Sequence, residues 1–428
     1  MASSNDNSSV LQLAEGILKD TKDLINSLSS SAVALPSFSA NSPALPTDSE
    51  FQQLQVRLKT QLEDLSLLVQ GPSKFYRYYL VTGYELAAFQ LALDFEFFTL
   101  VPTEGDISLE ELAKKAGLDQ DRTNRAIRML ITQRIFHETQ AGYFAHNAFS
   151  IALQKDEDLR SMVHYSFDEM LKASANTSDA IKKVPFEADS VHCPFYDRFG
   201  IPIFNYYKEH PEYSARFAKA MQGWRKLTSN INELRDIYPW ADLQGTVVDI
   251  GGGSGHVAME LARAFPHLEF AVQDGDASML AVGDKNAPAE LRGRLSFTQA
   301  NFFAAQQHKG AAAYLIRQCT HNWADHDVVT MLKAIVPGLE GSAPGTPLLI
   351  NDMIMPEPGA KDVPRMWERE RRQADMVMLV CYGAKQRTVS EFQGLLKEAD
   401  PRYAIRKVHA ERGALGILEV VLDKDLVN

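Results

Sequence analysis

Cysteine is scarce in this sequence. The three cysteines among 428 residues, Cys193, Cys319 and Cys381, are odd in number and lack the spacing of a metal site. This pattern indicates free thiols in a reducing, cytoplasmic compartment, and we expect neither a disulfide framework nor a bound metal. The N-terminus has no basic region followed by an apolar core, which predicts that there is no secretory signal. No apolar run reaches about 18 residues, so we expect no membrane-spanning helix.

An excess of positive charge is also missing. Lysine and arginine number 44 against 55 aspartates and glutamates, which gives a net charge of −11. An acidic balance argues against a nucleic-acid partner and against an anionic membrane surface. The apolar share of 45% and the charged share of 23% are those of an ordinary soluble globular protein. A chain of 428 residues is expected to form about two to three domains.

The most informative stretch is Gly245–Asp276, GTVVDIGGGSGHVAMELARAFPHLEFAVQDGD. An apolar run carrying Asp249 leads into a glycine-rich turn, a helical pattern and a second apolar run that ends at Asp274. This order predicts one βαβ unit of a doubly wound sheet. The glycines let the backbone approach a ligand, and the second acid is placed to hold ribose hydroxyls. Dinucleotides and S-adenosylmethionine (SAM) both use such a turn, and a tight turn without a ligand is the third alternative.

Residues 1–70 are predicted to form a helical arm with a linker. Leu11–Leu28 and a segment from about Glu50 to Val69 have the apolar spacing of helices, and Ser29–Asp48 between them is rich in Ser, Pro and Ala. Two amphipathic helices in front of an otherwise complete enzyme favour a dimer arm over simple packing within the chain.

Residues 71–160 contain the pattern of a winged-helix module. Ser108 caps a helix over Leu109–Ala116, a second helix follows over Asp119–Gln133, and a β-hairpin is expected around Gly142. Such a module can bind DNA, and three arginines lie at a spacing of three on its second helix. Because acids stand beside them in an acidic chain, a solvated or dimer-facing surface is the favoured interpretation.

The region 241–428 alternates strands and helices. Its last two strands lie close in sequence, which predicts a hairpin at the sheet edge and separates this region from the six parallel strands of a dinucleotide fold. The expected strands are Val247–Ile250, Phe270–Gln273, Leu295–Gln299, Ala313–Ile316, Pro347–Asp352, Tyr403–Ala410 and Gly416–Leu422.

Two phrases, DIGGGSGH at 249–256 and RQCTHNW at 317–323, together with the winged-helix pattern, resemble the class I SAM-dependent O-methyltransferases that act on small molecules in fungi and plants. The resemblance covers nearly the whole chain. It implies an α/β fold with a seven-stranded Rossmann-like methyltransferase domain at 241–428, a helical connector at 161–240 that lines the substrate pocket, and a winged-helix dimerisation domain at 71–160. It further implies SAM as cofactor and a homodimer.

The resemblance assigns His321 as the general base that takes the proton of the acceptor hydroxyl. The family orients this histidine with two carboxylates. Here Asp352 stands at one of these positions and Gln386 at the other. An amide can fix the ring through a hydrogen bond, but it cannot stabilise an imidazolium by charge.

The resemblance also implies two sets of binding residues. Asn301 replaces the acid that contacts adenine in the family, and Phe302 would cover the adenine face, with a core position for Phe302 equally open. The residues predicted to bind the cofactor are Asp249, Gly251, Gly253, Gly255, Asp274, Asn301, Phe302 and Arg317. The residues predicted to line the substrate pocket are Met221, Trp224, Thr228, Asp375 and Met376, with core packing as the alternative for the methionines and the tryptophan.

The leading hypothesis is methyl transfer from SAM to a hydroxyl of a phenolic or enolic natural product. The alternative is a SAM-binding pericyclase of the same family, which performs dehydration, Alder-ene or hetero-Diels–Alder steps without methyl transfer. Amides at Asn301, Asn322 and Gln386 favour this alternative, since such a site could polarise a carbonyl by hydrogen bonding. A third hypothesis, a winged-helix transcription regulator, is disfavoured by the acidic charge.

Overall fold

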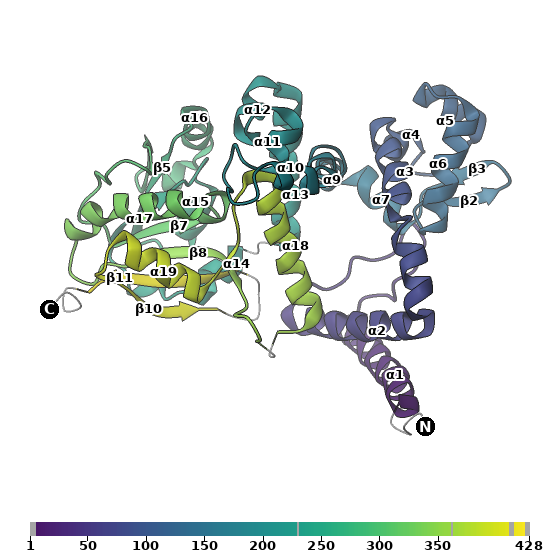
Figure 1. Cartoon of the computed structure of the whole chain (residues 1–428), viewed down its shortest axis with the longest axis horizontal. Helices are drawn as coiled ribbons and strands as arrows, with labels where there is room; N and C mark the ends of the chain where they lie inside the picture. Colours follow the sequence, from purple (N-terminus) through teal and green to yellow (C-terminus); the bar gives the residue numbers. More distant parts are fainter. Residues whose placement is uncertain (1–5, 229–230, 361–362, 411–414, 424–428) are drawn as a thin grey trace. The chain divides into compact units, whose positions relative to one another are not determined.

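The computed structural model describes residues 6–228, 231–360, 363–410 and 415–423, and it divides into two compact units (Figure 1). The helical unit comprises the described parts of Met1–Leu171, Pro211–Trp224 and Pro364–Trp367. The sheet unit comprises the described parts of Lys172–His210, Arg225–Val363 and Glu368–Asn428. This division has fewer parts than the four-part organisation expected above, which stays a prediction.

The helical unit begins with two long helices and continues into a small α/β module. Its elements are α1 (Asp6–Ser30), α2 (Ser49–Tyr79), α3 (Thr82–Asp94), α4 (Phe97–Leu100), β1 (Ile107–Ser108), α5 (Leu109–Ala116), α6 (Gln120–Thr132), β2 (His137–Gln140), β3 (Tyr143–Ala145), α7 (Ala148–Lys155), α8 (Glu157–Tyr165), the π-helix η1 (Ser166–Met170), the start of α9 (Leu171–Ala175) and most of α13 (Pro211–Thr228).

Helix α2 continues past the end predicted for it at Val69. Asp48 caps its start by accepting a hydrogen bond from the backbone N–H of Phe51 at 2.9 Å. The helical backbone breaks at Gly71, which has a φ of 70°, and resumes after Pro72. Proline fits the first turn of a helix, where its missing N–H has no partner to lose, so the glycine–proline pair produces a kink instead of an end.

The α/β module has the elements predicted for a winged helix. The hydroxyl of Ser108 caps α5, Gly117 ends α5 in the left-handed region, and β1, β3 and β2 form a three-stranded antiparallel sheet. The arginines of α6 are all paired with acids: Arg122 with Asp119 at 2.7 Å, Arg125 with Asp121 at 2.9 Å, and Arg128 with Glu138 at 2.8 Å. Because each of these charges has an acidic partner, the pairing supports a solvated or dimer-facing surface over a DNA-binding one.

The sheet unit is built on one mixed sheet. Its remaining elements are α10 (Thr177–Lys183), α11 (Pro194–Phe199), α12 (Ile203–Glu209), α14 (Ile231–Ile237), η2 (Trp240–Asp242), β4 (Gly245–Ile250), α15 (His256–Ala264), β5 (Leu268–Asp274), α16 (Ala277–Asn286), η3 (Ala289–Leu291), β6 (Leu295–Gln299), β7 (Ala313–Arg317), η4 (Thr320–Asn322), α17 (Asp325–Glu340), β8 (Leu348–Met355), most of α18 (Arg365–Tyr382), β9 (Arg387–Thr388), α19 (Val389–Ala399), β10 (Tyr403–His409) and β11 (Leu415–Leu422).

The strand order confirms the predicted fold class. Seven strands follow one another as β10-β11-β8-β7-β4-β5-β6, and the short β9 pairs with β8. The strands from β8 to β6 are parallel, while β11 runs antiparallel between β8 and β10, so the predicted edge hairpin is present. This is the seven-stranded arrangement that the family resemblance implied. The sequence pattern did not predict the short β9, nor the two-residue β1 of the helical unit.

Helices cover both faces of the sheet (Figure 1). Alternate residues of β4 point to opposite sides: Val248 and Ile250 pack into a core with α17 and α19, and Val247 packs into a second core with α14 and α15. A central parallel strand is buried on both faces, which explains why Val247, Val248 and Ile250 of β4 are all apolar and buried. The carboxyl ends of the parallel strands therefore meet at one edge, where ligands bind in open α/β sheets.

Candidate active site

The glycine turn at the end of β4 is too tight for side chains. Gly251, Gly253 and Gly255 have φ angles of 73°, 56° and 70°, which L residues rarely adopt. A Cβ at Gly252 would lie 2.5 Å from a carboxylate oxygen of Asp249. The turn thus brings bare backbone to the ligand-binding edge of the sheet.

Asp274 at the tip of β5 ties this turn to the neighbouring strand. Its Oδ2 accepts a hydrogen bond from the N–H of Gly253 at 2.9 Å, and its Oδ1 accepts one from the N–H of Asp276 at 2.9 Å. A carboxylate has about four lone-pair positions, so Asp274 keeps acceptor capacity for ribose hydroxyls. The predicted position of this acid beside the turn is thereby consistent with a nucleoside ligand.

Asp249 lies buried beneath the turn, with 2% of its surface exposed. Its Oδ2 has no hydrogen-bond partner among the described residues. Burial raises the pKa of the Asp249 carboxyl to about 7; the charge of Arg317 opposes this rise and Asp274 adds to it. A buried carboxylate without a partner is costly, and a nearby cation reduces that cost. The bare turn and this acid therefore fit SAM, which carries an ammonium and a sulfonium.

The other predicted cofactor residues lie at the ends of β6 and β7. Asn301 is exposed, and its Oδ1 accepts a hydrogen bond from the N–H of Phe303 at 3.0 Å. The ring of Phe302 is half-buried and packs edge-on against Trp323 at 5.7 Å, so it combines a core contact with partial exposure. Arg317 donates to the Oδ1 of Asn351, the residue beside it on β8.

His321 and Asp352 lie together, as predicted. His321 is in the short helix η4 after β7, and Nδ1 of its ring lies 2.5 Å from Oδ1 of Asp352 on β8. The hydroxyl of Thr320 donates to Oδ2 of the same carboxylate at 2.6 Å. Burial alone raises the pKa of Asp352, but the His321 ring, the Thr320 hydroxyl and the N–H of Met353 outweigh it and hold the pKa below its usual range. The carboxylate consequently stays ionised.

The histidine loop lies beside the glycine turn. A Cβ placed on Gly251 would be 3.4 Å from Sγ of Cys319, two residues before His321. The cofactor cradle and the histidine therefore occupy the same edge of the sheet unit.

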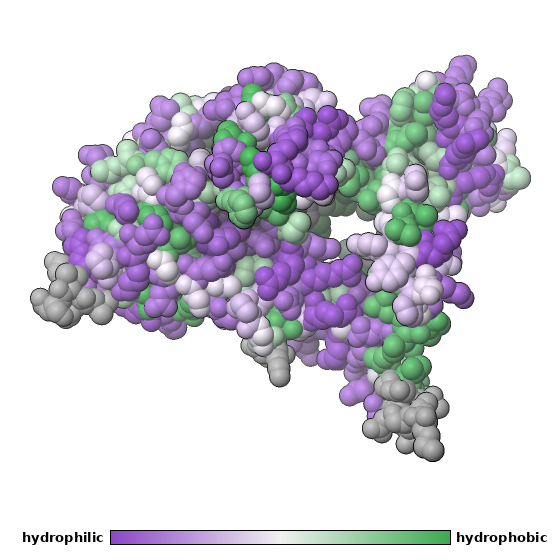
Figure 2. All heavy atoms as spheres, in the orientation of Figure 1, coloured by the Kyte–Doolittle hydropathy of each residue, from purple (hydrophilic) through white to green (hydrophobic). Residues whose placement is uncertain are grey.

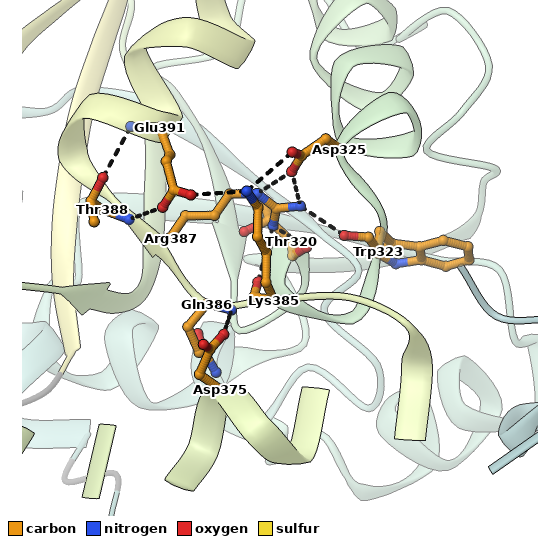
Figure 3. Close-up of polar contacts among 9 residues, drawn as sticks. All are labelled: Thr320, Trp323, Asp325, Asp375, Lys385, Gln386, Arg387, Thr388 and Glu391. Carbon is orange, nitrogen blue, oxygen red and sulfur yellow. Dashed lines mark hydrogen bonds and ion pairs between the residues drawn. The ribbon is translucent and has the colours of Figure 1, made fainter. Parts of the chain in front are cut away.

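Gln386 does not contribute a carboxylate, and its contacts are of another kind. It is buried, its backbone N–H donates to Oδ1 of Asp375 at 2.8 Å, and its side-chain Oε1 has no partner among the described residues. Figure 3 shows Asp375 and Gln386 facing each other. Asp375 thus holds the segment that carries Gln386, while the neighbouring Met376 is 50% exposed. The orienting role of Gln386 and the pocket-lining roles of Asp375 and Met376 stay predictions.

Three further substrate residues were predicted on α13. Met221 and Trp224 belong to the helical unit and are each 37% exposed, so they are not core residues of that unit. Thr228 ends α13, and its side chain lies outside the part of the structure that is described. The assignment of these residues to a substrate pocket stays a prediction.

Sequence reasoning missed Arg387. Its side chain is fully buried and donates to Oδ1 of Asp325 and to the backbone carbonyls of Thr320, Trp323 and Lys385 (Figure 3). We refer to these contacts as the Arg387 network. The arginine stands next to Gln386 in the polar segment GAKQRT, so the sequence alone does not mark it as buried.

Across the described ranges, no three His, Cys, Asp or Glu side chains gather as a metal site requires. Within the same residues, no helix combines the length and the hydrophobicity needed to cross a bilayer.

Comparison with known proteins identifies the family of this chain. The O-methyltransferase domain family matches residues 178–401. The O-methyltransferase sol2 of Alternaria solani is 50% identical over 97% of this chain and 96% of its own length. The solved complex of OxaC with S-adenosylhomocysteine (SAH) and oxaline has a TM-score of 0.75 at 20% identity, covering 97% of this chain and all of OxaC.

A solved pericyclic reaction enzyme also shares the fold, with a TM-score of 0.72 at 19% identity, covering 94% of this chain and 98% of its own. At that identity the likeness concerns the fold alone, whereas the similarity to sol2 extends over nearly the whole sequence. The pericyclase alternative is therefore not favoured. The chain belongs to the O-methyltransferase family, whose members use SAM as methyl donor.

Proposed function

We propose that this enzyme methylates a hydroxyl of a small phenolic or enolic natural product, with His321 as the general base. The contact between His321 and Asp352 carries this proposal. Because Nδ1 of the ring donates to the buried carboxylate, Nε2 is left as the nitrogen that accepts a proton. The complex of OxaC with SAH and oxaline supports an acceptor of small-molecule size.

The side chains around His321 suit this role. When bound, SAM supplies an electrophilic methyl group on its sulfonium. Asp352 fixes the tautomer and orientation of the ring and stabilises the imidazolium that forms, while Thr320 occupies the other carboxylate oxygen. Most of the rate would come from alignment of the acceptor oxygen with the methyl carbon.

The cofactor would lie against the glycine turn. Gly251, Gly253 and Gly255 would allow close approach, Asp274 would accept from ribose, and Asp249 would face the positive charge. Asn301 and Phe302 would contact adenine, with Arg317 supporting this edge. The acceptor would meet Met221, Trp224, Thr228, Asp375 and Met376.

Turnover with a panel of simple phenols tests the reaction class. We expect SAH and a methyl ether to form in equal amounts, since each transfer consumes one SAM. Conversion of a substrate to a cyclised or dehydrated product without SAH would contradict the proposal and support the pericyclase alternative.

The enzyme is further proposed to be a homodimer that associates through its N-terminal arm. Several apolar side chains of the helical unit are exposed, and Figure 2 shows hydrophobic spheres along α2. Among them are Leu11 at 60%, Leu18 at 56%, Leu68 at 56%, Val69 at 76% and Leu80 at 77% exposure. Exposed apolar patches of this kind mark interaction sites. Light scattering during size-exclusion chromatography should give twice the chain mass, and Leu68→Glu together with Val69→Glu should give the monomer mass; a monomeric parent protein would refute the dimer.

A cytoplasmic location is proposed as well. All three cysteines are free in the structure, which supports the proposed cytoplasmic location.

A further inference from the structure

We propose that Arg387 is a positioning residue for His321. By holding both ends of η4, the arginine would keep the imidazole ring against Asp352. This inference rests on the proposed role of His321 and adds a residue whose effect is transmitted through the backbone.

The guanidinium has no donor to spare for another partner. Nε and Nη2 donate to Oδ1 of Asp325 at 2.9 and 2.7 Å, and Nη2 also donates to the carbonyl of Trp323 at 2.8 Å. Nη1 donates to the carbonyls of Thr320 and Lys385 at 3.0 and 3.3 Å. An arginine has five N–H donors, so these five contacts use all of them. The side chain has 0% exposure, which keeps the contacts out of competition with water.

Two of these acceptors bracket the catalytic loop. The carbonyls of Thr320 and Trp323 lie on either side of His321, and Arg387 contacts both. Thr320 also donates its hydroxyl to Asp352, whose other oxygen contacts the His321 ring. A single residue therefore connects the guanidinium to the carboxylate that orients the histidine.

The loop needs such support because its backbone is strained. Gln318 has a φ of 47°, in the left-handed region that non-glycine residues seldom adopt. Strained backbone at an active site persists only where the surrounding contacts over-determine it. Arg387 supplies these contacts from a separate segment, β9, which pairs with β8 two residues beyond Asp352 through Ile354. The arginine and the aspartate thus belong to one framework.

The charge of Arg387 is balanced by Asp325 and not by the aspartate that contacts His321. Asp325 begins α17 and also lies 3.2 Å from Nζ of Lys385. Burial alone raises the pKa of Asp325, but Arg387 and Lys385 outweigh it and hold the pKa below its usual range. Because Asp325 neutralises the guanidinium, Asp352 remains free to pair with His321.

A purely stabilising role of Arg387 and a positioning role predict different effects when the arginine is replaced. Loss of a buried arginine would lower the stability of the fold in either case. Only the positioning role changes the hydrogen bond between His321 Nδ1 and Asp352 in protein that remains folded. This bond is short, so its proton should resonate far downfield in proton NMR.

The experiment compares Arg387→Lys and Arg387→Ala with the matched control Arg402→Ala. Arg402 also forms a multidentate ion pair in the sheet unit, with Asp400 and Glu340, and among the described residues its side chain does not contact the histidine loop. The readouts are the downfield Nδ1 proton, assigned by its absence in His321→Ala, the affinity for SAH, and kcat as a function of pH with a phenol accepted by the parent enzyme.

We expect both Arg387 variants to lose the downfield resonance while binding SAH within about twofold of the parent. A misplaced base should lower kcat by about tenfold to a hundredfold and shift its pH dependence. Added guanidinium should restore the resonance in Arg387→Ala, and Arg402→Ala should retain it. If Arg387→Ala fails to fold, the resonance and pH profile of Arg387→Lys decide the matter; if Arg387→Lys fails to fold, the resonance and guanidinium rescue of Arg387→Ala decide it.

An unchanged resonance and pH profile in folded Arg387→Lys and Arg387→Ala would overturn the inference. This result is distinct from failure of the proposed function, which would appear as full methyl transfer by His321→Ala. The first outcome concerns how the ring is held, and the second concerns what the ring does.

Discussion

Replacing Asp249 by Asn should stabilise the ligand-free enzyme and weaken its binding of SAM. The carboxyl is buried beneath the glycine turn, and one of its oxygens has no partner among the described residues. Its pKa rises from the ordinary 3.8 to about 7. Because each pKa unit corresponds to about 1.4 kcal/mol, a charged Asp249 at pH 8 costs the ligand-free fold about 4 kcal/mol.

The sign of the pH dependence follows from proton binding. Between about pH 4 and pH 7 the folded protein keeps a proton on Asp249 that the unfolded chain has released. The contribution of this residue to the free energy of unfolding therefore falls as the pH rises through that window. An asparagine has no charge to bury, so the variant should gain about 1–4 kcal/mol over the parent at pH 8 and little at pH 4.

Urea denaturation of the two proteins at several pH values measures this difference directly. Asp284→Asn, which changes an exposed acid on α16, is the matched control and should show no such pH dependence. Titration calorimetry should find SAM bound at least about tenfold more weakly by Asp249→Asn, since the acid no longer faces the sulfonium and ammonium. A variant that is no more stable than the parent at pH 8, or that binds SAM as tightly, would refute the reasoning.

Two further predictions concern the same edge of the sheet. Gly252→Ala would place a Cβ 2.5 Å from the Asp249 carboxylate, so SAH affinity should fall by at least about tenfold; unchanged calorimetric affinity would show that the turn can relax. Asp352→Asn removes the charge that orients His321, so kcat should fall by about a hundredfold or more while SAM affinity changes by less than about twofold. A parallel loss of SAM affinity would instead place Asp352 in the cofactor site.

The parts of the fold that could be predicted are those fixed by local pattern. Leu295–Gln299 was predicted with the bounds that β6 has, and the cap at Ser108 was predicted at the residue that forms it. The pairing of His321 with Asp352 was implied by family resemblance, and the structure brings the two residues to 2.5 Å. β7 and β8 are neighbouring parallel strands, so residues near their carboxyl ends are expected to lie close together.

The parts that could not be predicted depend on contacts between distant segments. Arg387 donates to the carbonyls of Thr320 and Trp323, more than sixty positions away, and backbone acceptors carry no signal in the side-chain sequence. A helix was expected to end at about Val69, and only the tertiary structure decides whether the chain kinks or stops at the following Gly71 and Pro72. The left-handed backbone of Gln318 belongs to the same class, because nothing about a glutamine favours it.

The most direct test of the account is the rate of SAH formation by His321→Ala with a phenol that the parent enzyme methylates. The account predicts that the variant binds SAM normally, because His321 lies outside the glycine turn, and that its kcat falls by about a hundredfold or more. Methyl transfer at the parent rate by folded His321→Ala would contradict the central claim that this histidine removes the acceptor proton.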